Sequence, residues 1–358
     1  MEQLDLFAEL AEPAAPAPDK AITLPKPTAG QFAAPAKPQP TPAPAKPQPT
    51  PAPAKPQPTK KKRGPEFAIS PTKGADFGER VSYAWHQKHG GNRMEIPLGL
   101  VATLALWPLK ENPRTLAEFL RGLDAPQILQ CVREVAAYWW MRRPDLIDTA
   151  SLLFSWAEED KHPAPLLGAI EATWRAALDA HALDHTGHAD PAWNSEVDLM
   201  SWTITNLRHN TARQGLGEYH TPPEVCDNMT AQILGSDPEA IREGFSLLDP
   251  CAGTGGMFRS AAQHLRYMGL EPARFTWFAQ EIDPLAAAGC AVNIIVWGLG
   301  PNALVACGDT LAEGNLWPRA VEHRRATVKH RDDVVATIKM AEAVRKVEQL
   351  VTGGAEAA

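Results

Sequence analysis

The sequence predicts an α/β protein with three parts: a disordered proline-rich tail, an all-helical domain, and part of an open parallel sheet followed by a helix. Three observations predict it. Half of the 34 prolines precede residue 66, apolar residues recur at helical spacing from about residue 75 to 210, and short apolar strands alternate with helices after residue 240. We place the boundaries at 1–74, 75–210, 211–316 and 317–358, and the last segment is predicted to be an amphipathic helix.

The tail contains a repeat. Residues 36–59 carry the sequence AKPQPTPAP twice in full and once truncated. Proline at this density favours polyproline II, and a segment with so few large apolar side chains cannot offset its chain entropy by burial. The repeat ends in the basic cluster at 60–63, which could touch phosphate, although a solvated linker end is the favoured interpretation. We therefore expect residues 1–70 to be disordered and removable.

The first residues of the tail form a short motif, made of Gln3, Leu4, Asp5, Leu6 and Phe7. It resembles the peptide by which bacterial replication and repair proteins bind the sliding clamp of DNA polymerase. In such peptides the apolar side chains anchor in a pocket and a long tether lets them reach the partner. The alternative is an amphipathic helix, because apolar residues here also recur at a spacing of three.

The helical region holds eight of the 11 tryptophans, enough apolar surface for a core of its own. Trp139 and Trp140 could stack on bases, but at helical spacing such residues are usually core. The residues His181, His185 and His188 have a spacing that could hold a metal. Because a glycine and an Asp-Pro pair indicate that this helix is ending, we predict no metal site.

Composition and charge exclude several classes of protein. The net charge is −7, so no global basic field draws the chain onto nucleic acid. The five cysteines form no C-x-x-C pair, which argues against a disulfide framework or a zinc ribbon. The acidic N-terminus does not resemble a secretory signal, and the longest apolar run, 96–109, is too short to span a bilayer. These features predict a cytoplasmic protein that has no membrane contact.

The ligand-binding signal begins after residue 240. A short strand, 245–249, runs into the turn PCAGTGG, where Gly253, Gly255 and Gly256 would let the backbone approach a ligand at the start of a helix. The next strand, 275–281, ends on Glu281, where a dinucleotide-type fold places an acid on ribose hydroxyls. A third strand leads to Asp309. This order describes the first half of an open parallel sheet with a ligand at its carboxyl edge.

Four segments now identify a family. GEYHTPPEVCDNM (217–229), LLDPCAGTGGM (247–257), QEIDP (280–284) and GDTL (308–311) resemble the N6-adenine DNA methyltransferases, especially the modification subunits of type I restriction systems. The resemblance implies a partial Rossmann-like fold of the class I methyltransferase type. It also implies S-adenosylmethionine as cofactor, DNA as a direct or indirect partner, and a possible specificity or catalytic subunit.

The resemblance assigns roles to particular residues. Thr221 and Asp249, together with the loop from Gly253 to Gly256, would hold the methionine part of the cofactor. Glu281 would accept the ribose hydroxyls, and Asp309 would accept from the adenine amino group. The chemistry of the two acids agrees with these roles, because a carboxylate accepts hydrogen bonds from two hydroxyls or from an exocyclic amine better than a neutral side chain does.

The sequence also departs from the family. Related enzymes carry, after a fourth strand, an Asn or Asp followed by two prolines and an aromatic residue, which hold a flipped adenine. No such motif follows Asp309, and residues 332–340, which begin like that strand, are predicted to be helical. We therefore assign no catalytic residue and expect catalysis to need a partner. The alternatives are a nonenzymatic accessory or regulatory module that binds the cofactor, and a protein-glutamine methyltransferase.

The missing strand has a structural consequence. The first strand, 245–249, would be left at an unpaired edge of the sheet, which is an aggregation hazard unless it is covered. We expect it to be covered either by the helical domain or by the C-terminal helix, which would fold back or pair with another chain.

Overall fold

The computed structural model describes residues 71–90, 93–108, 112–187, 189–208, 221–241 and 245–355, which lie within one compact unit formed by residues 69–358. The peptide from Gln3 to Phe7, the proline-rich repeat and His188 lie outside the described residues. Within the described ranges, the helices are too short or too polar to cross a membrane.

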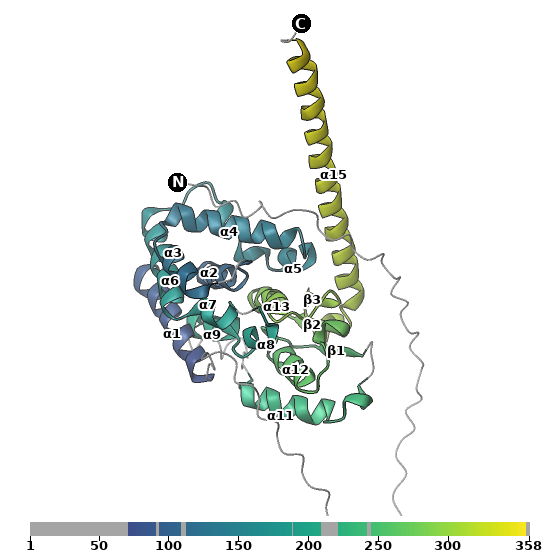
Figure 1. Cartoon of the computed structure of the whole chain (residues 1–358). Coiled ribbons are helices and arrows are strands. Elements are labelled where there is room, and N and C mark those ends of the chain that lie inside the picture. The colour runs from purple at the N-terminus through teal and green to yellow at the C-terminus, as the bar shows by residue number, and fades with distance from the viewer. Residues whose placement is uncertain are drawn as a thin grey trace, which may run out of the picture. The chain divides into compact units, whose positions relative to one another are not determined.

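The first half of the described chain is helical, as predicted (Figure 1). The α-helices are α1 (Pro71–Lys88), α2 (Glu95–Ala105), α3 (Pro113–Arg121), α4 (Ala125–Trp140), α5 (Pro144–Thr149), α6 (Ala164–Asp179), α7 (Ala182–Thr186), α8 (Pro191–Asn194) and α9 (Leu199–Leu207). The 3-10 turns η1 (Ser151–Leu153) and η2 (Ser155–Glu158) lie between α5 and α6. Helix α1 begins before residue 75, slightly earlier than the predicted boundary.

Local capping explains where these helices begin. The Asp124 side chain accepts from the backbone N–H of Gln127, whose own side chain accepts from the N–H of Asp124, so α4 starts with a capping box. Pro113 and Pro144 occupy the first turns of their helices, where a missing N–H costs nothing. The prolines that break the sequence pattern therefore mark helix starts.

The second half of the chain builds the parallel sheet. Its elements are α11 (Pro223–Leu234), η3 (Pro238–Ala240), β1 (Ser246–Asp249), α12 (Gly256–Tyr267), η4 (Pro272–Arg274), β2 (Thr276–Glu281), α13 (Pro284–Val296), β3 (Ala303–Cys307), α14 (Thr310–Glu313) and α15 (Trp317–Ala355). The strand order is β1-β2-β3 and both pairs are parallel, with Leu248 beside Phe278 and Phe278 beside Leu304. The predicted α/β fold with three parallel strands is confirmed, and residues 332–340 are helical as expected.

The hydrophobic core is continuous between the helical region and the sheet, although the sequence suggested a separate helical core. Trp277 and Val305, on one face of the sheet, belong to the same buried cluster as Trp85 and Trp174 of the helices. Trp139 packs against this cluster and donates through Nε1 to the carbonyl of Leu106 at 2.6 Å. It is a partly buried structural residue, which agrees with the interpretation of the tryptophan pair as core.

The opposite face of the sheet is covered by the beginning of α15. Leu316 and Ala320 form a small buried cluster with Phe278, Leu304 and Ala306. Figure 1 shows α15 passing beside β3 and α5, which it contacts. Beyond residue 335 the described side chains of α15 are exposed. The start of the helix therefore belongs to the fold, while its later turns face solvent.

The edge of the sheet at β1 is not covered as expected. Helix α15 packs on β3, and within the described residues β1 pairs only with β2. The side chain of Leu248 is 60% exposed. The reason is the strand order: β3 lies at one edge, so the helix that follows it reaches the β2–β3 side, and none of the described residues pairs with the outer edge of β1.

Candidate functional site

The turn between β1 and α12 has the backbone that its glycines predict. Gly253 and Gly255 have φ values of 56° and 96°, a region that side chains with a Cβ rarely adopt. A Cβ on Gly255 would also approach Sγ of Cys290 to 3.3 Å, so α13 packs closely against this turn. Gly256 is the first residue of α12 and has neither requirement. Two of the three predicted glycines are thus explained by geometry.

Glu281 closes the turn from the next strand. Its Oε2 accepts from the backbone N–H of Gly253 at 2.7 Å, and its Oε1 accepts from the N–H of Asp283 at 2.9 Å. The residue is 9% exposed. A carboxylate can accept about four hydrogen bonds, so Glu281 has capacity for further donors while it holds the turn.

Asp249 lies at the end of β1, beside Glu281. Its Oδ1 accepts from the backbone N–H of Cys251 at 3.1 Å. Burial raises the pKa of Asp249, the Cys251 N–H opposes that rise, and the nearby negative charge of Glu281 adds to it. The carboxyl ends of two neighbouring strands therefore present two acids that repel one another, a setting that favours a cationic ligand.

Asp309 follows β3 and has a structural task. Its Oδ1 accepts from the backbone N–H groups of Leu311 and Ala312, at 2.9 and 3.1 Å, and so caps the short helix α14. The next residue, Thr310, donates from Oγ1 to the carbonyl of Pro250 at 2.9 Å. This bond ties the end of β3 to the turn after β1, so the structure brings Asp309 to the same edge as Asp249 and Glu281.

Thr221 lies just before α11 and is exposed. Its carbonyl accepts from the thiol of Cys226 at 3.7 Å. A Cβ added to Gly256 would meet Sγ of Cys226 at 3.7 Å, so the first turn of α11 lies against the glycine turn. Residues 217–220 of the same motif lie outside the described residues. The Thr221 segment is thus placed near the site, and its predicted contact with the methionine part remains a prediction.

Asp198, a residue that the sequence analysis did not select, holds the turn from the helical side. It is buried at the start of α9. Its Oδ2 accepts from Oγ1 of Thr254 at 2.7 Å, and its Oδ1 accepts from Nδ2 of Asn293 at 2.8 Å. The same amide of Asn293 also donates to the carbonyl of Thr254 at 2.8 Å. One carboxylate therefore joins α9, the glycine turn and α13.

Two exposed aliphatic side chains flank the acids. Ile282 follows Glu281 and is 63% exposed, and Leu311 lies two residues after Asp309 and is 97% exposed. Exposed side chains of this size contribute nothing to the core, and single cases are common on surfaces. Their sequence position beside two acids at one sheet edge makes them candidate walls for a flat apolar ring.

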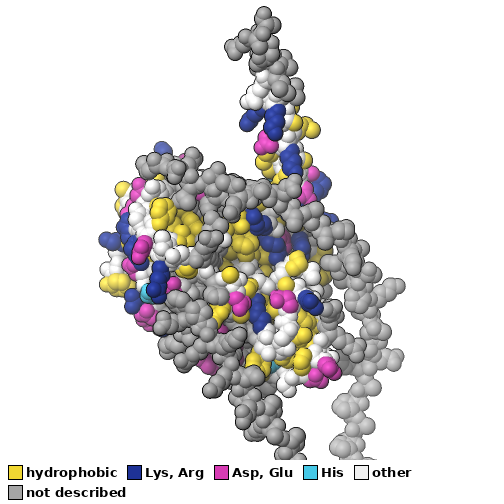
Figure 2. Space-filling model, viewed as in Figure 1, with side chains coloured by type: hydrophobic (Ala, Val, Ile, Leu, Met, Phe, Trp, Pro, Cys, Tyr) yellow, Lys and Arg dark blue, Asp and Glu magenta, His cyan; other side chains and the backbone are white. Residues whose placement is uncertain are grey.

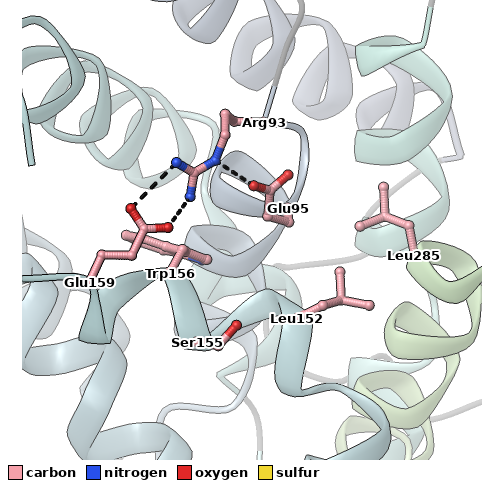
Figure 3. A pocket seen from close by; sticks show the side chains of 7 residues that line it. All are labelled: Arg93, Glu95, Leu152, Ser155, Trp156, Glu159 and Leu285. Atoms are coloured by element: carbon pink, nitrogen blue, oxygen red, sulfur yellow. Dashed lines mark hydrogen bonds and ion pairs between the residues drawn. The ribbon is translucent and has the colours of Figure 1, made fainter.

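A separate cavity lies between the helical region and α13 (Figure 3). Its volume is about 540 Å³, and Arg93, Trp156 and Leu285 are among its lining residues. The Arg93 guanidinium donates to Glu95 at 2.6 Å and to Glu159 at 2.5 Å, so its charge is already matched by two carboxylates. None of the predicted site residues lines this cavity.

The two helical histidines do not share a site. His181 begins α7 with a φ of 66° and contacts Asp184, and its side chain is 73% exposed. His185 is buried, and burial lowers its pKa to about 4. The pair serves the local fold of α7.

The comparison with known families decides the assignment. Residues 197–337 match the family described as N-6 DNA Methylase. This part of the chain is therefore similar to that family. The match includes Asp198, the glycine turn, Glu281 and Asp309, and it confirms the predicted resemblance to the N6-adenine DNA methyltransferases over these residues. The methyl donor of this family is S-adenosylmethionine.

The other comparisons add a structural relative. A solved methyltransferase subunit of a type I restriction-modification system from Streptococcus thermophilus is similar, with 17% sequence identity and a TM-score of 0.43. The similarity covers 69% of this chain and 60% of that chain. No curated protein matches the sequence.

Proposed function

We propose that the chain binds S-adenosylmethionine at the carboxyl edge of its sheet and takes part in N6-adenine methylation of DNA, with a partner needed for catalysis. The observation that carries this proposal is the closure of the glycine turn by Glu281, whose carboxylate accepts from Gly253 at 2.7 Å. The acid and the turn are thus held together where an open parallel sheet binds its ligand.

The residues present fit the cofactor. Space for a ligand is open over Gly253, because a Cβ there would meet no heavy atom of the described residues within 4 Å. The sulfonium and ammonium charges of the cofactor suit a site with two carboxylates. Asp249 and Thr221 would hold the methionine part, and Glu281 would accept the ribose hydroxyls. When bound, the cofactor supplies an electrophilic methyl group.

The adenine end of the cofactor fits the other side of the site. Ile282 and Leu311 would provide apolar contacts to the ring. The bonds that cap α14 use Oδ1 of Asp309, so Oδ2 can accept from the exocyclic amine. Asp309 would therefore combine its capping role with recognition of the base.

The described residues lack one feature that catalysis requires. A methyltransferase must hold the target adenine outside the duplex and accept hydrogen bonds from its amino group. In the described part of the chain, β3 is followed by α14 and α15, and no strand brings such acceptors to the sheet edge. We propose that a catalytic or specificity subunit supplies them in the cytoplasm. The same observation favours a second candidate function, a nonenzymatic module that binds the cofactor within a DNA-modification complex.

Methyl transfer from labelled cofactor to mixed-sequence DNA tests this proposal. The isolated chain should produce little or no N6-methyladenine, and the chain with its partner should produce it. Robust, saturable labelling of adenine by the isolated chain would show that the acceptors lie within the chain and would overturn the requirement for a partner. Cofactor binding without methylation under any pairing would favour the nonenzymatic module.

We also propose that the peptide from Gln3 to Phe7 binds the sliding clamp. Support comes from the sequence alone, since a pair of apolar anchors on a long proline-rich tether suits a short linear motif. Replacing Leu6 and Phe7 together by alanine should abolish binding to the purified clamp. Unchanged binding would return these residues to the helical interpretation.

A further inference from the structure

The β1 edge of the sheet is built to accept another strand. The N–H of Thr276 donates to the carbonyl of Phe245 at 3.2 Å, so Phe245, Leu247 and Asp249 direct their backbone groups toward β2. Because alternate residues of a strand face opposite neighbours, Ser246 and Leu248 direct theirs away from the sheet. An unpaired row of this kind is a template for strand addition.

The side chain of Leu248 continues an apolar row across the sheet. In the strand register it lies beside Phe278, which lies beside Leu304. Phe278 and Leu304 are 4% and 5% exposed under the start of α15, whereas Leu248 is 60% exposed. The row is therefore covered over two strands and open at the third.

Helix α11 carries further exposed apolar side chains. Val225, Met229 and Ile233 recur every four residues and are 43%, 45% and 70% exposed. The opposite side of α11, including Cys226, packs on α12, and α12 in turn contacts β1. Figure 2 shows hydrophobic side chains on the visible face in the region of α11 and β1. We name Val225, Met229, Ile233 and Leu248 the β1–α11 surface.

The charges beside this surface specify the kind of partner. Residues 221–313 contain eleven acidic residues, four arginines and no lysine. Among those arginines, Arg259 pairs with Asp227 at 2.8 Å and Arg266 donates to the backbone of Trp297. Asp249 and Glu281 are at the carboxyl edge. Arg208, outside this range, pairs with Asp283 at 2.7 Å, so its charge is also matched. The acidic excess disfavours a phosphate backbone, so a partner that brings DNA to this edge is expected to carry basic side chains.

We propose that a second, different polypeptide adds a parallel β-strand to β1, covers the β1–α11 surface with apolar side chains, and brings basic residues to the acidic edge. The role of this added strand in catalysis rests on the proposed function. In an open parallel sheet the ligand crevice lies where the strand order reverses. The order β1-β2-β3 runs in one direction only, and a strand added beyond β1 would create the reversal next to Asp249.

A second copy of this chain does not satisfy the same geometry. Two copies related by a twofold axis would pair their β1 strands antiparallel, because an isologous contact repeats the same edge on both sides. The amino end of the second β1 would then lie beside Asp249. The acidic residues of both copies would also be brought together, which charge repulsion disfavours.

Photo-crosslinking in the full chain identifies the occupant. The probe is p-benzoylphenylalanine at position 248, introduced into the protein in its native host, with the same probe at Tyr83 of α1 as control. Tyr83 is 67% exposed, so its probe reports nonspecific contact. The proposal expects a crosslinked product at position 248 and none at position 83. The peptide crosslinked to position 248 should lie in a strand of a different protein. No enrichment at 248, or a crosslink to the chain itself, would overturn it.

Two variants at one position then test strand addition with the purified partner. Leu248→Pro removes the outward N–H, while Leu248→Thr keeps the N–H and removes the large apolar side chain. The proline variant should bind the partner about tenfold more weakly than the threonine variant, because a strand edge without its donor cannot pair. Equal affinity of both variants would refute strand addition.

Cofactor binding by the same variants separates this inference from the proposed function. Both variants keep Asp249, Glu281 and the glycine turn, so calorimetric affinity for S-adenosylmethionine should stay within about threefold of the parent chain. Loss of cofactor affinity in the proline variant alone would show that the variant disturbs the turn, and a crosslink competition with the parent chain then decides on docking. A parent chain that docks its partner without binding cofactor would refute the proposed function and leave the docking surface in place.

Discussion

Replacing Asp198 by alanine should destabilise the chain and loosen the cofactor turn. The Asp198 carboxylate caps α9 by accepting from the N–H of Ser201 at 2.9 Å. It also accepts from Thr254 at 2.7 Å and from Asn293 at 2.8 Å, and all three acceptor bonds vanish in the variant. Asp198→Asn is the matched control, because an amide keeps one oxygen for Ser201 and Asn293 while the Thr254 hydroxyl can turn to accept from the new amide.

The expected loss of unfolding free energy follows from these three hydrogen bonds. Loss of an N-cap costs about 1 kcal/mol. A buried donor left without its acceptor costs about 1 to 3 kcal/mol, and Asn293 falls at the low end because it still donates to the carbonyl of Thr254. The expected loss of unfolding free energy is therefore about 3 to 4 kcal/mol for Asp198→Ala and below about 1.5 kcal/mol for Asp198→Asn.

Urea unfolding and cofactor calorimetry of both variants form the assay. The alanine variant should unfold at a lower urea concentration and, at a temperature where it is still folded, bind S-adenosylmethionine more weakly than the asparagine variant. If the two variants unfold alike, the carboxylate is not holding the turn. If the alanine variant is unstable but binds the cofactor normally, Asp198 supports the fold alone and does not position the site.

Two further predictions concern the stability of the fold. Burial lowers the pKa of His185 from 6.5 to about 4. Because the unfolded chain binds a proton between these values and the folded chain does not, the free energy of unfolding should fall by about 3 kcal/mol from pH 6.5 to pH 4. His185→Gln should lose that part of the pH dependence in urea titrations, and an unchanged slope would contradict the burial. Ending the chain after residue 314 should uncover Phe278 and Leu304, and the shortened chain should aggregate in size-exclusion chromatography. Ending the chain after residue 337 should not cause aggregation. A soluble, cofactor-binding 1–314 chain would show that α15 is dispensable.

The local parts of the site could be predicted from the sequence. The strand, glycine turn and helix around Gly253 are encoded by consecutive residues, and the structure gives Gly253 and Gly255 the positive φ that the turn requires. Glu281 was found because a fixed spacing separates it from the turn. Its bond to Gly253, however, makes it a structural partner of the turn as well as a candidate ribose acceptor.

The longer-range parts could not be predicted in the same way. Asp198 is 56 residues from Thr254 and 95 from Asn293, and a capping aspartate before an apolar run gives no sign of such partners. The sequence suggested α15 as a cover for the sheet, but not which strands it covers. The unpaired edge at β1 was expected, but the helix that follows β3 packs on the β2–β3 side, so Leu248 stays exposed.

Calorimetric titration of the full chain with S-adenosylmethionine tests the central claim most directly. The parent chain should give saturable heat, and Glu281→Ala should weaken binding by about 1 to 3 kcal/mol, the cost of unpaired donors in the turn and the ribose. Glu322→Ala is the control, because Glu322 is an exposed acid of α15 that pairs with Arg325. No heat with the parent chain at millimolar cofactor, or equal affinity in the Glu281→Ala variant, would contradict the account.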